Sequence, residues 1–127
     1  NNDYIVFKDG TEWTEDNVKF VGVKAYHSEN TAFGVIIEAE GKKYYVTGDT
    51  LYNRNIFKVL PNDIYAVFLP INGVGNNMNM ADAARFARDC GANFAVPMHF
   101  GMFDNINPQD FMAENRVIPE VYKTIPL

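Results

Sequence analysis

The stretch that decides the fold is Tyr44-Tyr45-Val46-Thr47-Gly48-Asp49-Thr50, read as YYVTGDT. Its first four residues are aromatic or β-branched, which is typical of a strand, and the Gly-Asp pair then ends that strand abruptly. A carboxylate is thereby placed at the carboxyl end of a strand, where open α/β sheets usually bind their ligands. Asp49 is therefore the first candidate residue of a functional site.

The chain contains 2 histidines, and each follows an apolar run in the way that Asp49 does. His27 comes after the run that begins at Val18, and His99 comes after Phe94-Ala95-Val96-Pro97-Met98. Imidazole and carboxylate suit Zn, Mn or Fe, and the absence of a thiol from the set argues against a structural zinc site. Each residue alone is better explained as a hydrogen-bonding or turn residue, but the joint arrangement predicts half of a metal site.

Composition excludes several classes of protein. With 127 residues, we expect a single domain covering positions 1–127. The formal charge of −5 argues against a nucleic-acid partner, and no apolar run reaches the roughly 20 residues that span a bilayer. One cysteine, Cys90, allows no internal disulfide and fits a cytoplasmic location. The chain opens Asn1-Asn2-Asp3 without a methionine, which is typical of a piece of a longer protein.

The first half of the sequence predicts an antiparallel meander. Tyr4–Phe7 and Thr11–Trp13 are expected to form a hairpin around Asp9-Gly10, because Asp-Gly favours such turns. Three further strands are expected at Val18–Ala25, Phe33–Ala39 and Lys43–Val46.

The second half predicts a right-handed βαβ unit. Ile64–Pro70 is a near-continuous apolar run, as in a strand covered on both faces. Asn79 can cap a helix over Met80–Cys90 with Gly91 as its stop, and a parallel strand is expected at Asn93–Val96. The helix is expected to bury Met80, Ala84, Ala87 and Cys90.

Two weaker elements are expected near the carboxyl end. Asn107 and Pro108 predict the start of a helix, and Val121–Ile125 predicts an edge strand. Of the other candidate groups, Cys90 is better explained as a buried structural thiol than as a nucleophile. The loop Gly73–Asn77 is better explained as a plain turn than as an anion site, because it lacks Walker A spacing.

Four motifs occur in the order of a known family: Tyr26-His27-Ser28, Tyr45-Val46-Thr47-Gly48-Asp49-Thr50, Phe68-Leu69-Pro70-Ile71-Asn72-Gly73 and Pro97-Met98-His99-Phe100. With them the sequence resembles the metallo-β-lactamase superfamily, in its branch near the ascorbate-6-phosphate lactonases and related metal-dependent hydrolases. Asn79–Ala84 and Asp104–Pro108 add to the resemblance, which runs from about Val18 to Phe111.

The resemblance implies a role for each candidate ligand. His27 matches the family's middle histidine, a ligand of one metal, Asp49 matches the aspartate that bridges two metals, and His99 matches the last histidine. The family's upstream His-x-His-x-Asp-His does not occur in this chain. The fold class implied is therefore α/β (α+β), as the C-terminal half of an αββα sandwich whose N-terminal half is absent.

The resemblance also implies an activity. An intact member is a lactonase-like hydrolase with two divalent metal ions, zinc or manganese, whose bridging hydroxide attacks an ester, lactone or phosphoester of a small molecule. Asp49 is then catalytic as well as a ligand. This chain by itself is expected to be inactive and to need the missing half or an oligomeric partner. The alternative is a non-catalytic binding or assembly module, and an upstream ligand motif in the parent reading frame would distinguish the two.

Overall fold

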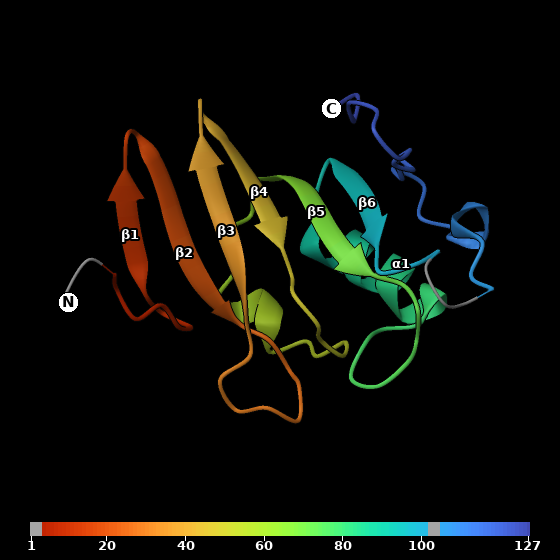
Figure 1. Ribbon diagram of the computed structural model, residues 1–127, viewed down its shortest axis with the longest axis horizontal. Helices are drawn as coiled ribbons and strands as arrows, with labels where there is room; N and C mark the ends of the chain where they lie inside the picture. Colours follow the sequence, from red (N-terminus) through yellow and green to blue (C-terminus); the bar gives the residue numbers. More distant parts are fainter. Residues whose placement is uncertain (1–3, 102–104) are drawn as a thin grey trace.

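The computed structural model describes residues 4–101 and 105–127, which form a six-stranded sheet whose spatial order follows the sequence. The strands are β1 (Glu12–Glu15), β2 (Val18–Lys24), β3 (Phe33–Ala39), β4 (Lys42–Val46), β5 (Ile64–Pro70) and β6 (Phe94–Met98). Neighbours from β1 to β4 are antiparallel, whereas β4, β5 and β6 are parallel. Consequently β2, β4, β5 and β6 run in one direction, and their carboxyl ends lie at one edge of the sheet (Figure 1).

Two of the three hairpins of the meander are closed by two-residue turns. Asp16 and Asn17 (φ 49° and 67°) join β1 to β2, and Glu40 and Gly41 (φ 52° and 77°) join β3 to β4. Positive φ at both positions matches the twist of paired strands. The strands expected at 18–25, 33–39 and 43–46 are therefore confirmed within a residue of their ends.

The prediction of a hairpin around Asp9-Gly10 is wrong. Residues 4–7 form no strand, and β1 pairs with β2 instead. The Asp9-Gly10 turn does exist, because the N–H of Thr11 donates to the carbonyl of Lys8 at 3.0 Å. It leads the chain into β1, however, and Gly10 donates to the carbonyl of Gly22 on β2 at 2.9 Å.

The βαβ unit is confirmed. Helix α1 (Met80–Cys90) begins where the side chain of Asn79 accepts a hydrogen bond from the N–H of Asp82, and it ends at Gly91 with φ 72°. Its buried residues are Ala83, Phe86, Ala87 and Cys90, so the expected burial is confirmed for Ala87 and Cys90, whereas Met80 and Ala84 pack against the core but are only partly buried. Periodicity alone places that face one residue off.

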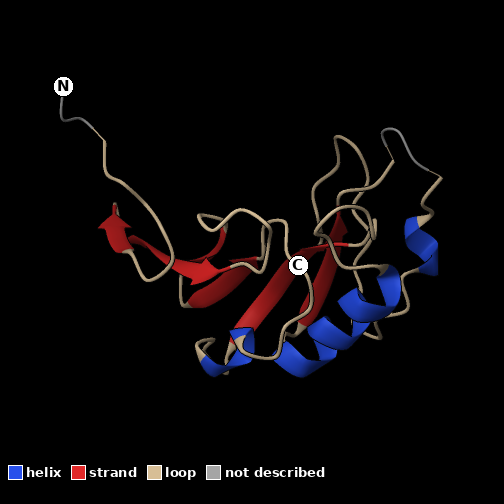
Figure 2. Cartoon of the chain, turned by 90° about the horizontal axis from the view of Figure 1, so that it is seen from below, coloured by secondary structure: helices blue, strands red, loops and turns tan. Residues whose placement is uncertain are grey.

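The sheet is covered by helices on one face (Figure 2). On that side Phe86 packs between Tyr45 of β4 and Phe57 of the single-turn helix η1 (Ile56–Lys58), with ring centroids 6.2 and 4.9 Å away. Side chains alternate along a strand, so the neighbours of Tyr45 point to the other face. That face carries a hollow of about 280 Å³ lined only by apolar residues: Ile37, Tyr44, Val46, Phe68 and Met98.

The carboxyl-terminal segment differs from expectation. Pro108–Asp110 forms a single 3₁₀ turn (η2) that Asn107 caps, and residues 121–125 form no strand. The outer edge of β6 is instead bridged at Ala95, which donates to the carbonyl of Asn115 and accepts from the N–H of Val117. Asp104, part of one quoted motif, lies outside the described residues. In the described parts of the chain, no helix is long and apolar enough to cross a membrane.

Candidate functional site

Asp49 lies in the loop that directly follows β4. We call the carboxyl end of a strand, with the first residues after it, the exit of that strand. A Cβ at Gly34 would lie 2.5 Å from the carbonyl oxygen of Thr47, and one at Gly48 would lie 2.8 Å from that of Phe33. Gly48 also has φ +68°, a conformation that glycine adopts without strain. The close approach of β3 therefore requires glycine at both positions, and the chain turns so that the Asp49 side chain is left half exposed.

The buried hydroxyl of Thr50 fastens this exit to the exit of β2. Its Oγ1 accepts a hydrogen bond from the N–H of Tyr26 at 2.8 Å and donates to the carbonyl of Leu51. Leu51 in turn donates to the carbonyl of Tyr26 at 2.9 Å. Thr50 is fully buried, so these bonds form away from competing water. Asp49 and His27 are thus each one residue away from a rigid connection between two strand ends.

The exit of β6 presents His99 against Asp49. The Nε2 atom of His99 lies 3.6 Å from Oδ1 of Asp49, and the two side chains are 49% and 52% exposed. His99 has φ 62°, in the left-handed region that histidine occupies at a cost of roughly 1–2 kcal/mol. Backbone strain of this kind gathers at functional sites, where the surrounding structure holds it.

Asn72, from the loop after β5, joins the same group. Its Nδ2 lies 3.1 Å from Nδ1 of His99, and its Oδ1 is buried without a hydrogen-bond partner. Ile71 donates to the carbonyl of Met98 at 3.3 Å, which keeps the two strand exits side by side. Reasoning from the sequence missed Asn72, although the same argument from strand ends would have found it two residues after Pro70.

The structure does not bring His27 into a cluster with the other two. Its Nδ1 accepts a hydrogen bond from the N–H of Glu29 at 3.1 Å, within its own loop. Among the described residues, no group of three or more His, Cys, Asp or Glu side chains is arranged to hold a metal ion. Asp49 and His99 are therefore brought together, whereas His27 forms no metal-holding group with them among the described residues. The ring of His27 is held by local geometry, whereas the other two meet across the sheet edge.

The remaining reactive group, Cys90, lies in the core. Its thiol is buried and donates to the carbonyl of Ala87, and burial raises its pKa to about 11. A thiolate is the nucleophilic form of cysteine, so this environment makes Cys90 inert. The expected structural role fits this placement.

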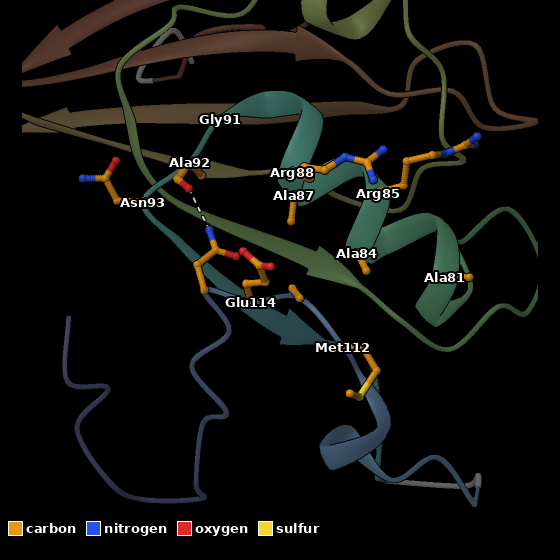
Figure 3. A pocket seen from close by; sticks show the side chains of 12 residues that line it. Ala81, Ala84, Arg85, Ala87, Arg88, Gly91, Ala92, Asn93, Met112 and Glu114 are labelled. Carbon is orange, nitrogen blue, oxygen red and sulfur yellow. Dashed lines mark hydrogen bonds between the residues drawn. The ribbon is translucent and has the colours of Figure 1, made fainter.

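A second hollow lies on the helix side of the sheet, between α1 and residues 112–115 (Figure 3). It has a volume of about 630 Å³, and the amide of Asn115 closes part of it by donating to the carbonyl of Ala92 at 2.7 Å. None of the candidate ligands lines it. Size alone therefore does not mark the functional site of this chain.

Solved structures identify the class of fold. Igni18, a metallo hydrolase from Ignicoccus hospitalis, is similar with a TM-score of 0.71 and 24% identity, over 84% of this chain and 50% of that one. The metallo-β-lactamase fold protein YhfI from Bacillus subtilis is similar with a TM-score of 0.71 and 20% identity, over 90% and 51%. The chain therefore matches about half of the metallo-β-lactamase fold, in the α+β class, as expected.

Sequence comparison then gives the relatives. A UPF0173 metal-dependent hydrolase from Anoxybacillus flavithermus is 33% identical over 111 residues, which are 82% of this chain and 44% of the relative. One from Alkaliphilus metalliredigens is 36% identical over 83 residues, 64% and 37% of the two chains. No protein-family model matches the sequence. The chain is thus related to the UPF0173 metal-dependent hydrolases, and it spans less than half the length of those it matches.

Proposed function

We propose that this chain is the C-terminal half of a metal-dependent hydrolase and that His27, Asp49 and His99 are its metal ligands. The observation that supports this is the approach of His99 Nε2 to Asp49 Oδ1 at 3.6 Å. Two ligands that each lie about 2.0–2.2 Å from one tetrahedral zinc ion would be roughly 3.3–3.6 Å apart. An imidazole nitrogen and a carboxylate oxygen at this distance fit a shared divalent metal.

The three candidate ligands and the residues beside Asp49 each have a defined task in this proposal. Asp49 and His99 would hold the metal from the exits of β4 and β6, and His27 would join them after its ring leaves the N–H of Glu29. Gly48 and Thr50 keep the carboxylate in place. When bound, divalent metal ions lower the pKa of water toward about 7 and polarise a carbonyl or phosphoryl oxygen.

The rest of the site would come from a partner half. The segments that match this chain make up less than half of each of the two relatives. The chain also offers only three proposed ligands, whereas two metal ions need more. The apolar hollow around Val46 and Phe68 lies on the face without helices and fits a second sheet. An upstream segment of the parent protein or an oligomeric partner would cover it.

The proposed metal ions suit several classes of substrate. We propose a small ester, lactone or phosphoester, since two divalent ions, zinc or manganese, stabilise the negative charge that develops in each case. We propose Arg54, in the loop that follows β4, as a phosphate contact. We also propose a cytoplasmic location, because the one cysteine of this chain is a free, buried thiol.

The test compares this chain with the full-length parent, each loaded with Zn²⁺ or Mn²⁺, on lactones, esters and phosphodiesters. The parent should bind two metals and turn over at least one class. The isolated chain should bind metal weakly and show no turnover above background, because water must replace the absent ligands. Turnover by the isolated chain alone would place the site elsewhere.

One observation favours the second candidate, a non-catalytic binding or assembly module. Within residues 4–101 and 105–127, no three side chains of the metal-binding kinds form a cluster. A module of this kind would keep the fold and the sheet face but bind no metal. A parent protein that is free of metal and inactive on all three substrate classes would decide for the module.

A further inference from the structure

The side-chain amide of Asn72 contacts His99 through its nitrogen, and its oxygen is an acceptor without a hydrogen-bond partner. The Nδ2 of the amide is 3.1 Å from Nδ1 of the imidazole, and the Oδ1 of the same amide is buried with no hydrogen-bond partner. A buried amide oxygen without a partner costs free energy, and this cost is removed when the amide exchanges its ends and a proton on Nδ1 is there to pair with Oδ1. Asn72 cannot easily move away, because an isolated bridge ties it to Asn79.

The position of the imidazole proton depends on which amide atom faces Nδ1. When Nδ2–H donates to Nδ1, a neutral ring must carry its proton on Nε2, on the side that faces Asp49. A metal ligand that binds through Nε2 needs the opposite tautomer, with the proton on Nδ1 and an acceptor for it. Rotation of the Asn72 amide by half a turn brings Oδ1 to that place.

We propose that Asn72 is a positioning residue that sets the tautomer of His99. With Nδ2 toward the ring, the proton stays on Nε2; with Oδ1 toward the ring, the proton stays on Nδ1 and the Nε2 lone pair is free for a metal. The part of this inference that concerns the metal-bound state rests on the proposed function. The part that concerns the metal-free state rests only on the contact between Asn72 and His99.

Both ring nitrogens of His99 have a polar neighbour. Its backbone is held at φ 62°, and Asn72 and Asp49 approach its two nitrogens from opposite sides. Gly73, with φ +66°, packs so closely that a Cβ there would lie 3.0 Å from that of Asn79. The backbone of the loop is thus constrained beside Asn72, and exchange of the two ends of its amide needs no backbone movement.

Three variants separate the possibilities. Asn72→Asp keeps an acceptor and removes the donor, whereas Asn72→Leu keeps the approximate shape and removes both. The matched control is Asn76→Leu, which removes the hydrogen bond from Asn76 to Ser28 Oγ in the same loop without touching His99. Thermal melts monitored by circular dichroism show that each variant is folded.

The first readout is the protonated nitrogen of His99 in the metal-free chain, from long-range ¹H–¹⁵N spectra at about pH 8. The chain has only 2 histidines, so His27→Gln assigns the signals. Wild type and Asn76→Leu should carry the proton on Nε2, and Asn72→Asp should carry it on Nδ1. The same tautomer in wild type and Asn72→Asp would overturn the inference.

The second readout is Zn²⁺ affinity, measured by competition with a chromophoric chelator. Loss of the acceptor in Asn72→Leu should weaken binding by roughly 10–100-fold, while Asn72→Asp and Asn76→Leu stay within a few-fold of wild type. Equal affinity in wild type and Asn72→Leu would overturn the metal-bound half. A wild-type chain that binds no Zn²⁺ would instead contradict the proposed function, and the tautomer comparison would still decide the role of Asn72.

Discussion

The hydroxyl of Thr50 accepts a hydrogen bond from the backbone N–H of Tyr26 at 2.8 Å, and this bond joins the exits of two strands that are not neighbours in the sheet. β3 lies between β2 and β4, so the two exits reach each other around its amino end. Asp49 and His27 flank the two bonded residues. The geometry of the candidate site therefore depends on a side chain that is not itself a ligand.

Thr50→Val should lower the free energy of unfolding by about 1–3 kcal/mol, because it leaves the part-buried N–H of Tyr26 without an acceptor. Urea denaturation measures the change. The control is Thr11→Val, which removes the acceptor of the exposed Lys8 N–H and should cost less than about 0.5 kcal/mol. Equal losses in the two variants would show that the Thr50 bond is not structurally important.

Gly48→Ala should destabilise the chain and weaken metal binding together. A methyl group there would lie 2.8 Å from the carbonyl oxygen of Phe33, so the β4 exit would shift and carry Asp49 with it. Gly41→Ala is the matched control, since Gly41 also has positive φ but nothing within 4 Å of the added atom. It should cost only about 1 kcal/mol of backbone strain and leave Zn²⁺ affinity unchanged. Equal effects on Zn²⁺ affinity would argue against this account of Asp49.

The helix-free face of the sheet should drive association. Val46→Lys places a charge in the apolar hollow shared with Phe68, and it should shift the isolated chain toward monomer in sedimentation experiments. Val121→Lys, at a position that is 81% exposed and outside the hollow, should leave the association state unchanged. A wild-type chain that is monomeric at all concentrations would favour the stand-alone module.

Cys90 should report unfolding. Because burial raises its pKa from 9.0 to about 11, the native thiol is almost entirely protonated at pH 8 and should react with Ellman's reagent at least 100-fold more slowly than the unfolded chain. The unfolded thiol loses its proton at lower pH than the native one, so stability should fall as pH rises above about 9. Cys90→Ser should remove this part of the alkaline dependence. Rapid labelling of the native chain would contradict the buried placement.

Much of the fold could be predicted because its signals are local. Phe33–Ala39, Ile64–Pro70 and Met80–Cys90 were expected with the bounds that the structure shows, since Asn79 and Gly91 mark the helix ends and turn residues bound the strands. The first hairpin was misplaced because two adjacent turns compete, and the choice depends on pairing with β2.

The site was harder to predict than the fold. The pair Asp49 and His99 followed from the rule that parallel strands end at one edge. Asn72 was missed because the argument from strand ends was applied only to His and Asp side chains, and its contact with His99 reveals its part. The orientation of His27 depends on its own loop, through the N–H of Glu29, which no pattern in the sequence shows.

The central claim is that Asp49 and His99 bind a catalytic metal, and the most direct measurement is the metal content of the full-length parent purified as wild type, Asp49→Ala and His99→Ala. Circular dichroism confirms that each variant is folded. We predict about two divalent ions per wild-type chain and a clear loss in both variants, with turnover abolished in Asp49→Ala. The same metal content and turnover in all three proteins would contradict the claim.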